Sequence, residues 1–228
     1  MGIDRAVTQG MLAGGIDARV EIYDWTGTDR GLVALGNVTR HREQSKIVAD
    51  KITRVARGED GAAAPKRIIV TSHSAGTGIA VWALEQLPDD VMIDDLVLIA
   101  SALSPQYDLS RALKHVRHKA WAFNSELDML VLGTGCKMFG TVDRVNTDAG
   151  GRVGFALPSE PAVAGQYEKF EQVPYDNDWM RFRNNGEHIG AMSRSFARNV
   201  IARVLKGEGL PPRATTTPSD LPTTRKAA

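Results

Sequence analysis

A serine flanked by small residues follows an apolar, β-branched run in this chain. The run is Arg67–Thr71, and Ser72 and Gly76 are the small residues two positions before and after Ser74. A strand that ends in such a turn and passes at once into a helix holds the serine in strained backbone, with its Oγ projecting above the sheet edge. The pattern is S-x-S-x-G, with Ser72 where glycine is usual. It predicts Ser74 as a nucleophile; the alternative is a serine that only caps the following helix.

A serine hydroxyl is a weak nucleophile and needs a base, which in turn needs an acid to orient it. Asp128 lies in a loop after the apolar run Ala120–Phe123, and His188 lies between two glycines near the end of the chain. The carboxyl ends of parallel strands meet at one edge of a sheet. We therefore expect Ser74, Asp128 and His188 to converge there, in the chain order Ser, Asp, His.

Four other histidines compete for the role of base. His41, His115 and His118 lie in polar, helical surroundings and are predicted at the surface, whereas His73 belongs to the turn beside the serine. His188 alone follows the loop that carries the acid, so it is the predicted base.

The identity of the acid is more open. Glu126 shares the loop of Asp128, and Asp176 and Asp178 lie nearer the predicted base along the chain. Asp24, at the end of a predicted strand, either faces the site or caps a turn. Asp128 is the predicted acid among these carboxylates.

Alternating strand and helix patterns surround these residues. Strands are predicted at Val20–Trp25, Arg67–Thr71, Leu96–Ala100, Ala120–Phe123 and Phe170–Tyr175, and helices around residues 3–12, 47–55, 79–87, 109–116 and 192–204. The proline in the last strand predicts an edge position, and residues 133–155 are expected to be irregular with short strands. The alternation predicts an α/β fold with a mostly parallel sheet and helices on both faces. One domain is expected over residues 1–206, followed by a disordered tail over residues 207–228.

The composition argues against several classes of function. The 228 residues are 43% hydrophobic and 24% charged with a net charge of +1, which favours neither nucleic acid nor an anionic membrane as a partner. The sequence has no apolar run long enough for a membrane span and no secretory signal over Met1–Gly15. The single cysteine, Cys136, permits no internal disulfide and no multi-cysteine metal site. A cytoplasmic protein without metal or cofactor is expected.

From about Val20 to Val204 the chain resembles the α/β-hydrolase serine hydrolases of the lipase and esterase type, through its nucleophile turn and its Ser-Asp-His order. The segment Leu98–Leu109 and the glycine-rich segment that follows resemble uncharacterised bacterial hydrolase-like proteins.

The resemblance implies a role for each site residue. Ser74 would be the nucleophile, His188 the general base and Asp128 its orienting carboxylate, with the backbone N–H of Ala75 as one oxyanion donor. The implied reaction is cleavage of a carboxylic ester or related acyl bond of a small-molecule substrate.

In that family a further strand precedes the first helix, and the loop after it supplies a second oxyanion donor. Here the helical pattern begins at the first residues. The missing strand would lie between the strands Val20–Trp25 and Arg67–Thr71, so either these two pair directly or the natural chain starts upstream. We expect the second, an N-terminally truncated α/β-hydrolase fold.

Two other functions compete with acyl hydrolysis. A non-catalytic binding or scaffold protein of the same fold is the alternative, and Ser72 in place of glycine favours it. A nucleotide-binding protein is excluded by motif, because no Gly-Lys-Ser/Thr follows a strand and Gly133–Gly135 lacks the dinucleotide-binding spacing.

Overall fold

The centre of the molecule is a sheet of four parallel strands. The computed structural model of the chain describes residues 2–27, 37–59 and 63–214. The sheet order follows the chain: β1 (Ile69–His73), β2 (Ile93–Ile99), β3 (Val116–Asn124) and β4 (Phe170–Pro174). All three neighbouring pairs are parallel, and β1 and β4 form the edges. The predicted α/β class is confirmed, and so is the edge position of the strand that contains Pro174.

The strands end level with one another. His73 pairs with Ile99, Ile99 with Phe123, and Phe123 with Val173. The residues that come next along the chain therefore leave the sheet at one edge. Every residue of β2 is buried, as expected for a parallel strand covered on both faces. The candidate site residues Ser74, Asp128 and His188 follow strands that end at this edge.

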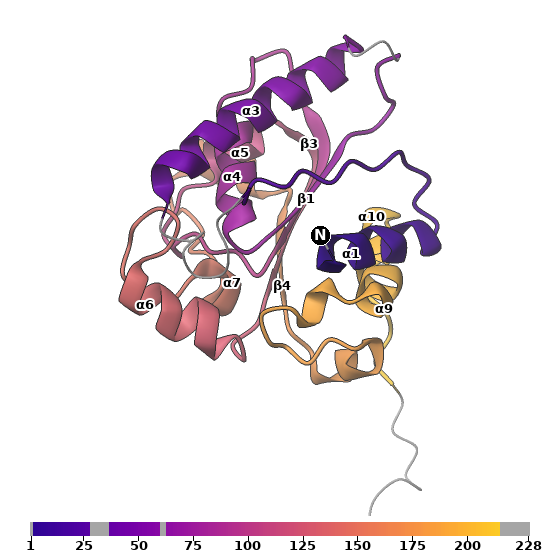
Figure 1. The fold of residues 1–228 in the computed structure, drawn as a ribbon, viewed down its shortest axis with the longest axis vertical. Helices are drawn as coiled ribbons and strands as arrows, with labels where there is room; N and C mark the ends of the chain where they lie inside the picture. The colour runs from indigo at the N-terminus through magenta and orange to yellow at the C-terminus, as the bar shows by residue number, and fades with distance from the viewer. Residues whose placement is uncertain (1, 28–36, 60–62, 215–228) are drawn as a thin grey trace, which may run out of the picture.

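Helices cover both faces of the sheet (Figure 1). On one side lie α3 (Val38–Arg57), α4 (Ala75–Leu84) and α5 (Ser110–Lys114). On the other side, α1 (Gly2–Ala13) packs against a C-terminal helical run. That run consists of η3 (Gly190–Met192), α9 (Arg194–Phe196), η4 (Ala197–Ile201) and α10 (Ala202–Leu205).

Two glycines allow α1 to approach the C-terminal run closely. A Cβ on Gly10 would lie 2.4 Å from the carbonyl oxygen of Arg194, and one on Gly14 would lie 2.4 Å from Cβ of Ala202. Any larger side chain at either position would push the helices apart. The first helix is thereby fixed to the segment that follows His188.

The predicted strand Val20–Trp25 is not part of the sheet, and this expectation was wrong. The segment runs extended along α3 (Figure 1). Glu21 pairs with Lys51, the Tyr23 hydroxyl donates to Gln44 over 2.6 Å, and the ring of Trp25 meets His41 edge-on. Its alternating side chains contact a helix rather than a neighbouring strand, although the period of two is the same. Within the described residues the sheet runs from β1 to β4 without a gap.

The glycine-rich stretch after β3 is helical rather than stranded. It contains η1 (Met129–Gly135), α6 (Cys136–Phe139) and α7 (Gly150–Val153), and α8 (Pro161–Tyr167) follows. The short strands expected in residues 133–155 are absent from this described stretch. Its glycines serve close packing instead: a Cβ on Gly151 would lie 2.1 Å from the backbone nitrogen of Ser101, just after β2.

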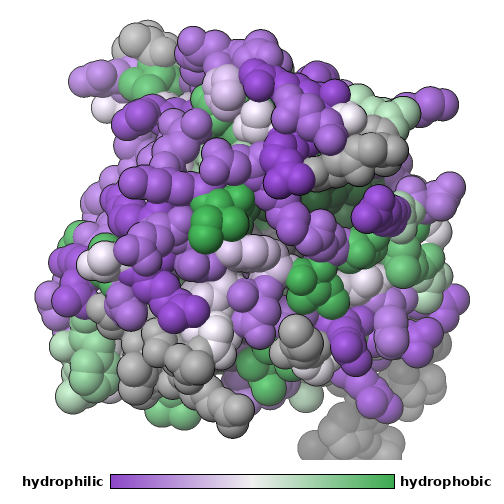
Figure 2. Space-filling view, turned by 45° about the horizontal axis from the view of Figure 1, so that its top comes forward, coloured by the Kyte–Doolittle hydropathy of each residue, from purple (hydrophilic) through white to green (hydrophobic). Residues whose placement is uncertain are grey.

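The buried residues of the hydrophobic core run from Val7 to Leu205 along the chain. Residues 207–214 of the predicted tail are described and contact η2 (Asn177–Phe182), since the backbone N–H of Ala214 donates to Asp178. Residues 215–228 lie outside the described part. Among the described helices, none has the length and apolarity that a membrane crossing needs. Hydrophilic residues cover most of the face viewed in Figure 2, with separate hydrophobic groups between them.

Candidate active site

Ser74 occupies the turn between β1 and α4 in a backbone conformation that serine rarely adopts. Its φ is 54° and its ψ is −130°. A non-glycine residue there costs of order 1–3 kcal/mol, and such conformations cluster at functional sites. The side chain of Ser74 makes no capping hydrogen bond to α4, so the capping alternative fails. Ser74 is half-buried.

The turn is held in place from β2 and from α4. The backbone N–H of Ser74 donates to Ile99 at 3.0 Å. The carbonyl oxygen of Ser74 accepts from the Thr77 hydroxyl at 2.7 Å and from the Thr77 N–H at 3.0 Å. The Thr77 Oγ1 also lies 2.9 Å from the buried Ser101 Oγ. Sequence reasoning missed Thr77, since one threonine in a small-residue run carries no signal of this role.

The small residues on either side of Ser74 have different surroundings. A Cβ on Gly76 would lie 3.1 Å from the indole nitrogen of Trp25, so any larger residue in the first turn of α4 would require the Trp25 ring to shift by a few tenths of an ångström. Ser72, two positions before the nucleophile candidate, fits inside the fold, but its Oγ is buried with no hydrogen-bond partner. Serine in place of glycine is thus accommodated without a polar role.

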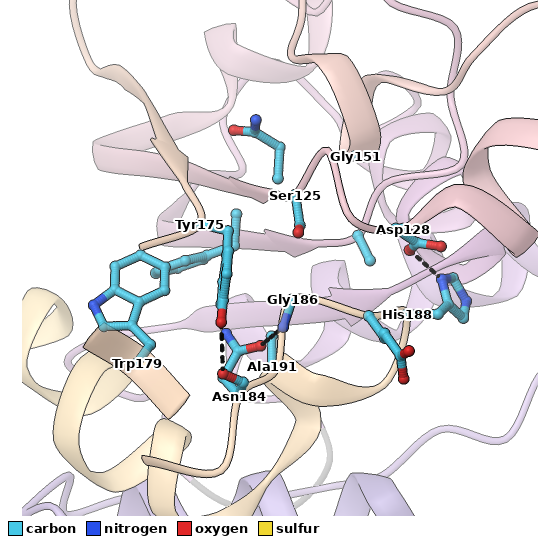
Figure 3. Close-up of a pocket in the computed structure, with 13 residues that line it drawn as sticks. Ser125, Asp128, Gly151, Tyr175, Trp179, Asn184, Gly186, His188 and Ala191 are labelled. Carbon is cyan, nitrogen blue, oxygen red and sulfur yellow. Dashed lines mark hydrogen bonds and ion pairs between the residues drawn. The ribbon is translucent and has the colours of Figure 1, made fainter. Parts of the chain in front are cut away.

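His188 lies in a loop between η2 and η3 that several contacts fix. The side chain of Asn184 accepts from the N–H of Gly186 at 3.0 Å, and the Tyr175 hydroxyl donates to the carbonyl of Asn184 (Figure 3). Gly186 has a φ of +79°, a conformation that favours glycine. A Cβ on Gly190 would lie 2.5 Å from Asn184 Oδ1. The two glycines that flank His188 therefore let its loop fold tightly.

Asp128 directly precedes η1 and is buried, with 3% of its surface exposed. Its Oδ1 accepts from the N–H of Leu132 at 3.3 Å, which caps η1. Its Oδ2 lies 2.7 Å from Nδ1 of His188 (Figure 3). Burial removes a carboxylate from water, and hydrogen-bond partners such as these offset that cost.

The structure brings the three predicted residues together. Nε2 of His188 lies 2.9 Å from Ser74 Oγ, and Nδ1 of the same ring faces Asp128. Since a carboxylate can only accept, Nδ1 carries the proton and the neutral ring presents the lone pair of Nε2 to the serine hydroxyl. This arrangement can remove the proton of Ser74 and stabilise the charge that His188 gains.

Ala75 is the first residue of α4 and is buried. The first N–H groups of a helix have no acceptor within it, and they lie at the positive end of the helix dipole. The N–H of Ala75 is therefore placed to donate to an oxygen that becomes negative beside Ser74.

The other carboxylates lie elsewhere. Asp24 accepts from the backbone and side chain of Thr26, which lowers its pKa, so the turn-capping interpretation holds. Asp176 caps η2, and Asp178 pairs with Arg181. Glu126 is exposed. Among these carboxylates, Asp128 is the one in contact with His188.

Two histidine predictions were wrong. His41 and His115 are buried rather than at the surface, with 0% and 6% exposure. His41 packs on the Trp25 ring, and His115 Nδ1 lies 2.9 Å from the Val91 carbonyl. Both contacts come from residues distant in sequence, which local polarity could not reveal. His118 is exposed, as predicted, but it lies on β3 and not on a helix.

Cys136 is buried and free, and burial raises the pKa of its thiol to about 11. The thiol is therefore protonated near neutral pH and is a poor nucleophile. No cluster of three or more potential metal ligands occurs in the described part of the chain.

The described residues line two cavities of different size, at opposite ends of the sheet. A cavity of about 20 Å³, room for a single water molecule, lies against Asp128, His188 and Tyr175 (Figure 3). A larger one of about 260 Å³ lies at the other end of the sheet, where Arg57 pairs with Asp90 and Arg117 with Asp94. The larger cavity is remote from the serine, and the charges around it are already paired. The smaller one is lined by Asp128 and His188 but not by Ser74.

Comparison with known proteins gives no family model, no curated protein and no solved structure that matches this chain.

Proposed function

We propose that the protein is a serine hydrolase of the α/β-hydrolase fold that cleaves a carboxylic ester or related acyl bond. The observation that carries the proposal is the placement of one imidazole between a strained serine and a buried carboxylate. Its support from topology is the position of the three residues after β1, β3 and β4 of one parallel sheet, in the order Ser, Asp, His.

In the proposed reaction Ser74 Oγ attacks the carbonyl carbon of the substrate while Nε2 of His188 takes the hydroxyl proton. Asp128 stabilises the resulting imidazolium, and the N–H of Ala75 donates to the oxyanion. Collapse of the tetrahedral intermediate breaks the bond to the alcohol, which leaves with the proton from His188. Water then attacks the acyl-enzyme by the same route and releases the acid.

No cofactor or metal takes part in this proposal. Ser74 supplies the nucleophile, and His188 supplies and accepts the proton at Nε2. The substrate is a small molecule with an acyl group.

Hydrolysis of p-nitrophenyl acetate by the wild type and by Ser74→Ala tests the proposal. We expect the wild type to release p-nitrophenol and the variant to fall by about 10⁴-fold or more. Equal rates in the two folded proteins would support the non-catalytic scaffold function instead, since a binding protein has no need of the hydroxyl.

A further inference from the structure

His73 lies in direct contact with the residue proposed as the base. Its Nε2 is 2.9 Å from the backbone carbonyl oxygen of His188, and the centroids of the two rings are 4.8 Å apart. A carbonyl can only accept, so Nε2 of His73 carries the proton and donates it. His73 is the last residue of β1 and directly precedes Ser74.

The contact joins two segments that are 115 residues apart in sequence. His188 sits in a loop, whose position depends on side-chain contacts rather than on strand pairing. The strand end, by contrast, is fixed by its pairing with Ile99. His73 therefore ties the backbone that carries the base to the backbone that carries the nucleophile.

Relying on the proposed function, we infer that His73 is a positioning residue, which holds the main chain of His188 so that its ring spans Ser74 and Asp128. His73 does not touch the reacting atoms in this scheme. Its side chain acts through the backbone of His188.

The charge state of His73 agrees with this role. Burial, followed by the neighbouring His188, lowers the pKa of His73 to about 4, while Asp4 of α1 and Asp128 act in the opposite direction. The ring is neutral near pH 7, so it adds no positive charge beside the imidazolium that forms on His188 during the reaction.

Three variants test the inference. His73→Leu replaces the imidazole by an apolar side chain and so removes the Nε2–H donor. His73→Gln restores an N–H donor. His115→Leu is the matched control, because a ring nitrogen of the buried His115, like that of the half-buried His73, lies 2.9 Å from a backbone carbonyl oxygen, and His115 is remote from Ser74. For each we would measure the thermal midpoint, kcat and KM for p-nitrophenyl acetate, and the rate of labelling by a fluorophosphonate probe.

We expect His73→Leu to lower kcat and the labelling rate by about 10- to 100-fold, with KM changed less than about twofold, as for a displaced catalytic group. His73→Gln should recover most of the loss. His115→Leu should lower the thermal midpoint and leave kcat at the wild-type value.

Two results would overturn the inference while the proposed function stands. In the first, the wild type is labelled and the His73→Leu variant is labelled at the same rate. In the second, the His73→Gln variant is as slow as His73→Leu. A folded wild type that neither labels nor hydrolyses the ester would remove the proposed function, and the role of His73 with it.

Discussion

Asp128 accepts a hydrogen bond from Nδ1 of His188 at 2.7 Å, although 60 residues separate the two in sequence. The carboxylate leaves β3 and the imidazole follows β4, the neighbouring strand. Because parallel strands bring their carboxyl ends to one edge, this pairing follows from the topology of the sheet. It fixes the tautomer that turns the lone pair of Nε2 toward Ser74.

Replacing the carboxylate of Asp128 by an amide should disable that tautomer. We expect Asp128→Asn to lower kcat for p-nitrophenyl acetate by about 10⁴-fold with the fold retained. Glu126→Gln, in the same loop but exposed, serves as control and should keep the wild-type kcat. A loss confined to the Glu126 variant would assign the acid differently.

Ser72 should be dispensable, in contrast to Ser74. The Oγ of Ser72 is buried without a hydrogen-bond partner, so its removal relieves a desolvation cost. Ser72→Ala is expected to raise the free energy of unfolding by about 1 kcal/mol or leave it unchanged, with the same kcat. Urea denaturation measures the first quantity. A variant less stable by more than about 1 kcal/mol would show that this hydroxyl has a partner after all.

Thr77 should matter for both stability and rate, because its hydroxyl donates to the carbonyl of Ser74. Thr77→Val leaves that carbonyl and the Ser101 hydroxyl without this partner, which should cost about 1–3 kcal/mol in unfolding free energy. It should also slow ester hydrolysis by about tenfold through a shifted serine.

The comparison variant is Thr53→Val in α3, whose hydroxyl likewise donates to a backbone carbonyl, that of Ala49 at 2.9 Å. It lies away from the serine and should leave the hydrolysis rate unchanged. Equal effects of the two substitutions on rate would mean that Thr77 has no special link to the nucleophile.

The lowered pKa of His73 makes stability depend on pH. The folded pKa is about 4 and the ordinary value is 6.5, so the unfolded chain takes up a proton that the folded chain refuses between these values. Stability is therefore lost as the pH falls from about 6.5 to about 4. From pH 7 to pH 5 this loss should reach about 2 kcal/mol in the wild type.

Urea unfolding of the wild type and His73→Gln at the two pH values measures this loss. The variant should lose about 2 kcal/mol less than the wild type, since glutamine does not titrate. Parallel losses would show that His73 gains its proton equally in both states.

The sequence predicted the parallel sheet and the meeting of Ser74, Asp128 and His188, because the carboxyl ends of parallel strands meet at one edge of a sheet. The predictions failed where contacts between residues distant in sequence determine the structure. The alternation of Val20–Trp25 is that of a strand, yet its side chains bind α3. His115 is buried by partners that no local pattern reveals, and the contact between His73 and the carbonyl of His188 depends on loop geometry alone.

Covalent labelling by a fluorophosphonate, followed by mapping of the modified peptide, tests the central claim that Ser74 is an activated nucleophile. The account predicts one adduct per wild-type chain, located on Ser74, with labelling abolished in Ser74→Ala and in His188→Ala. A folded wild type that gains no adduct, or gains it on another serine, would contradict the account.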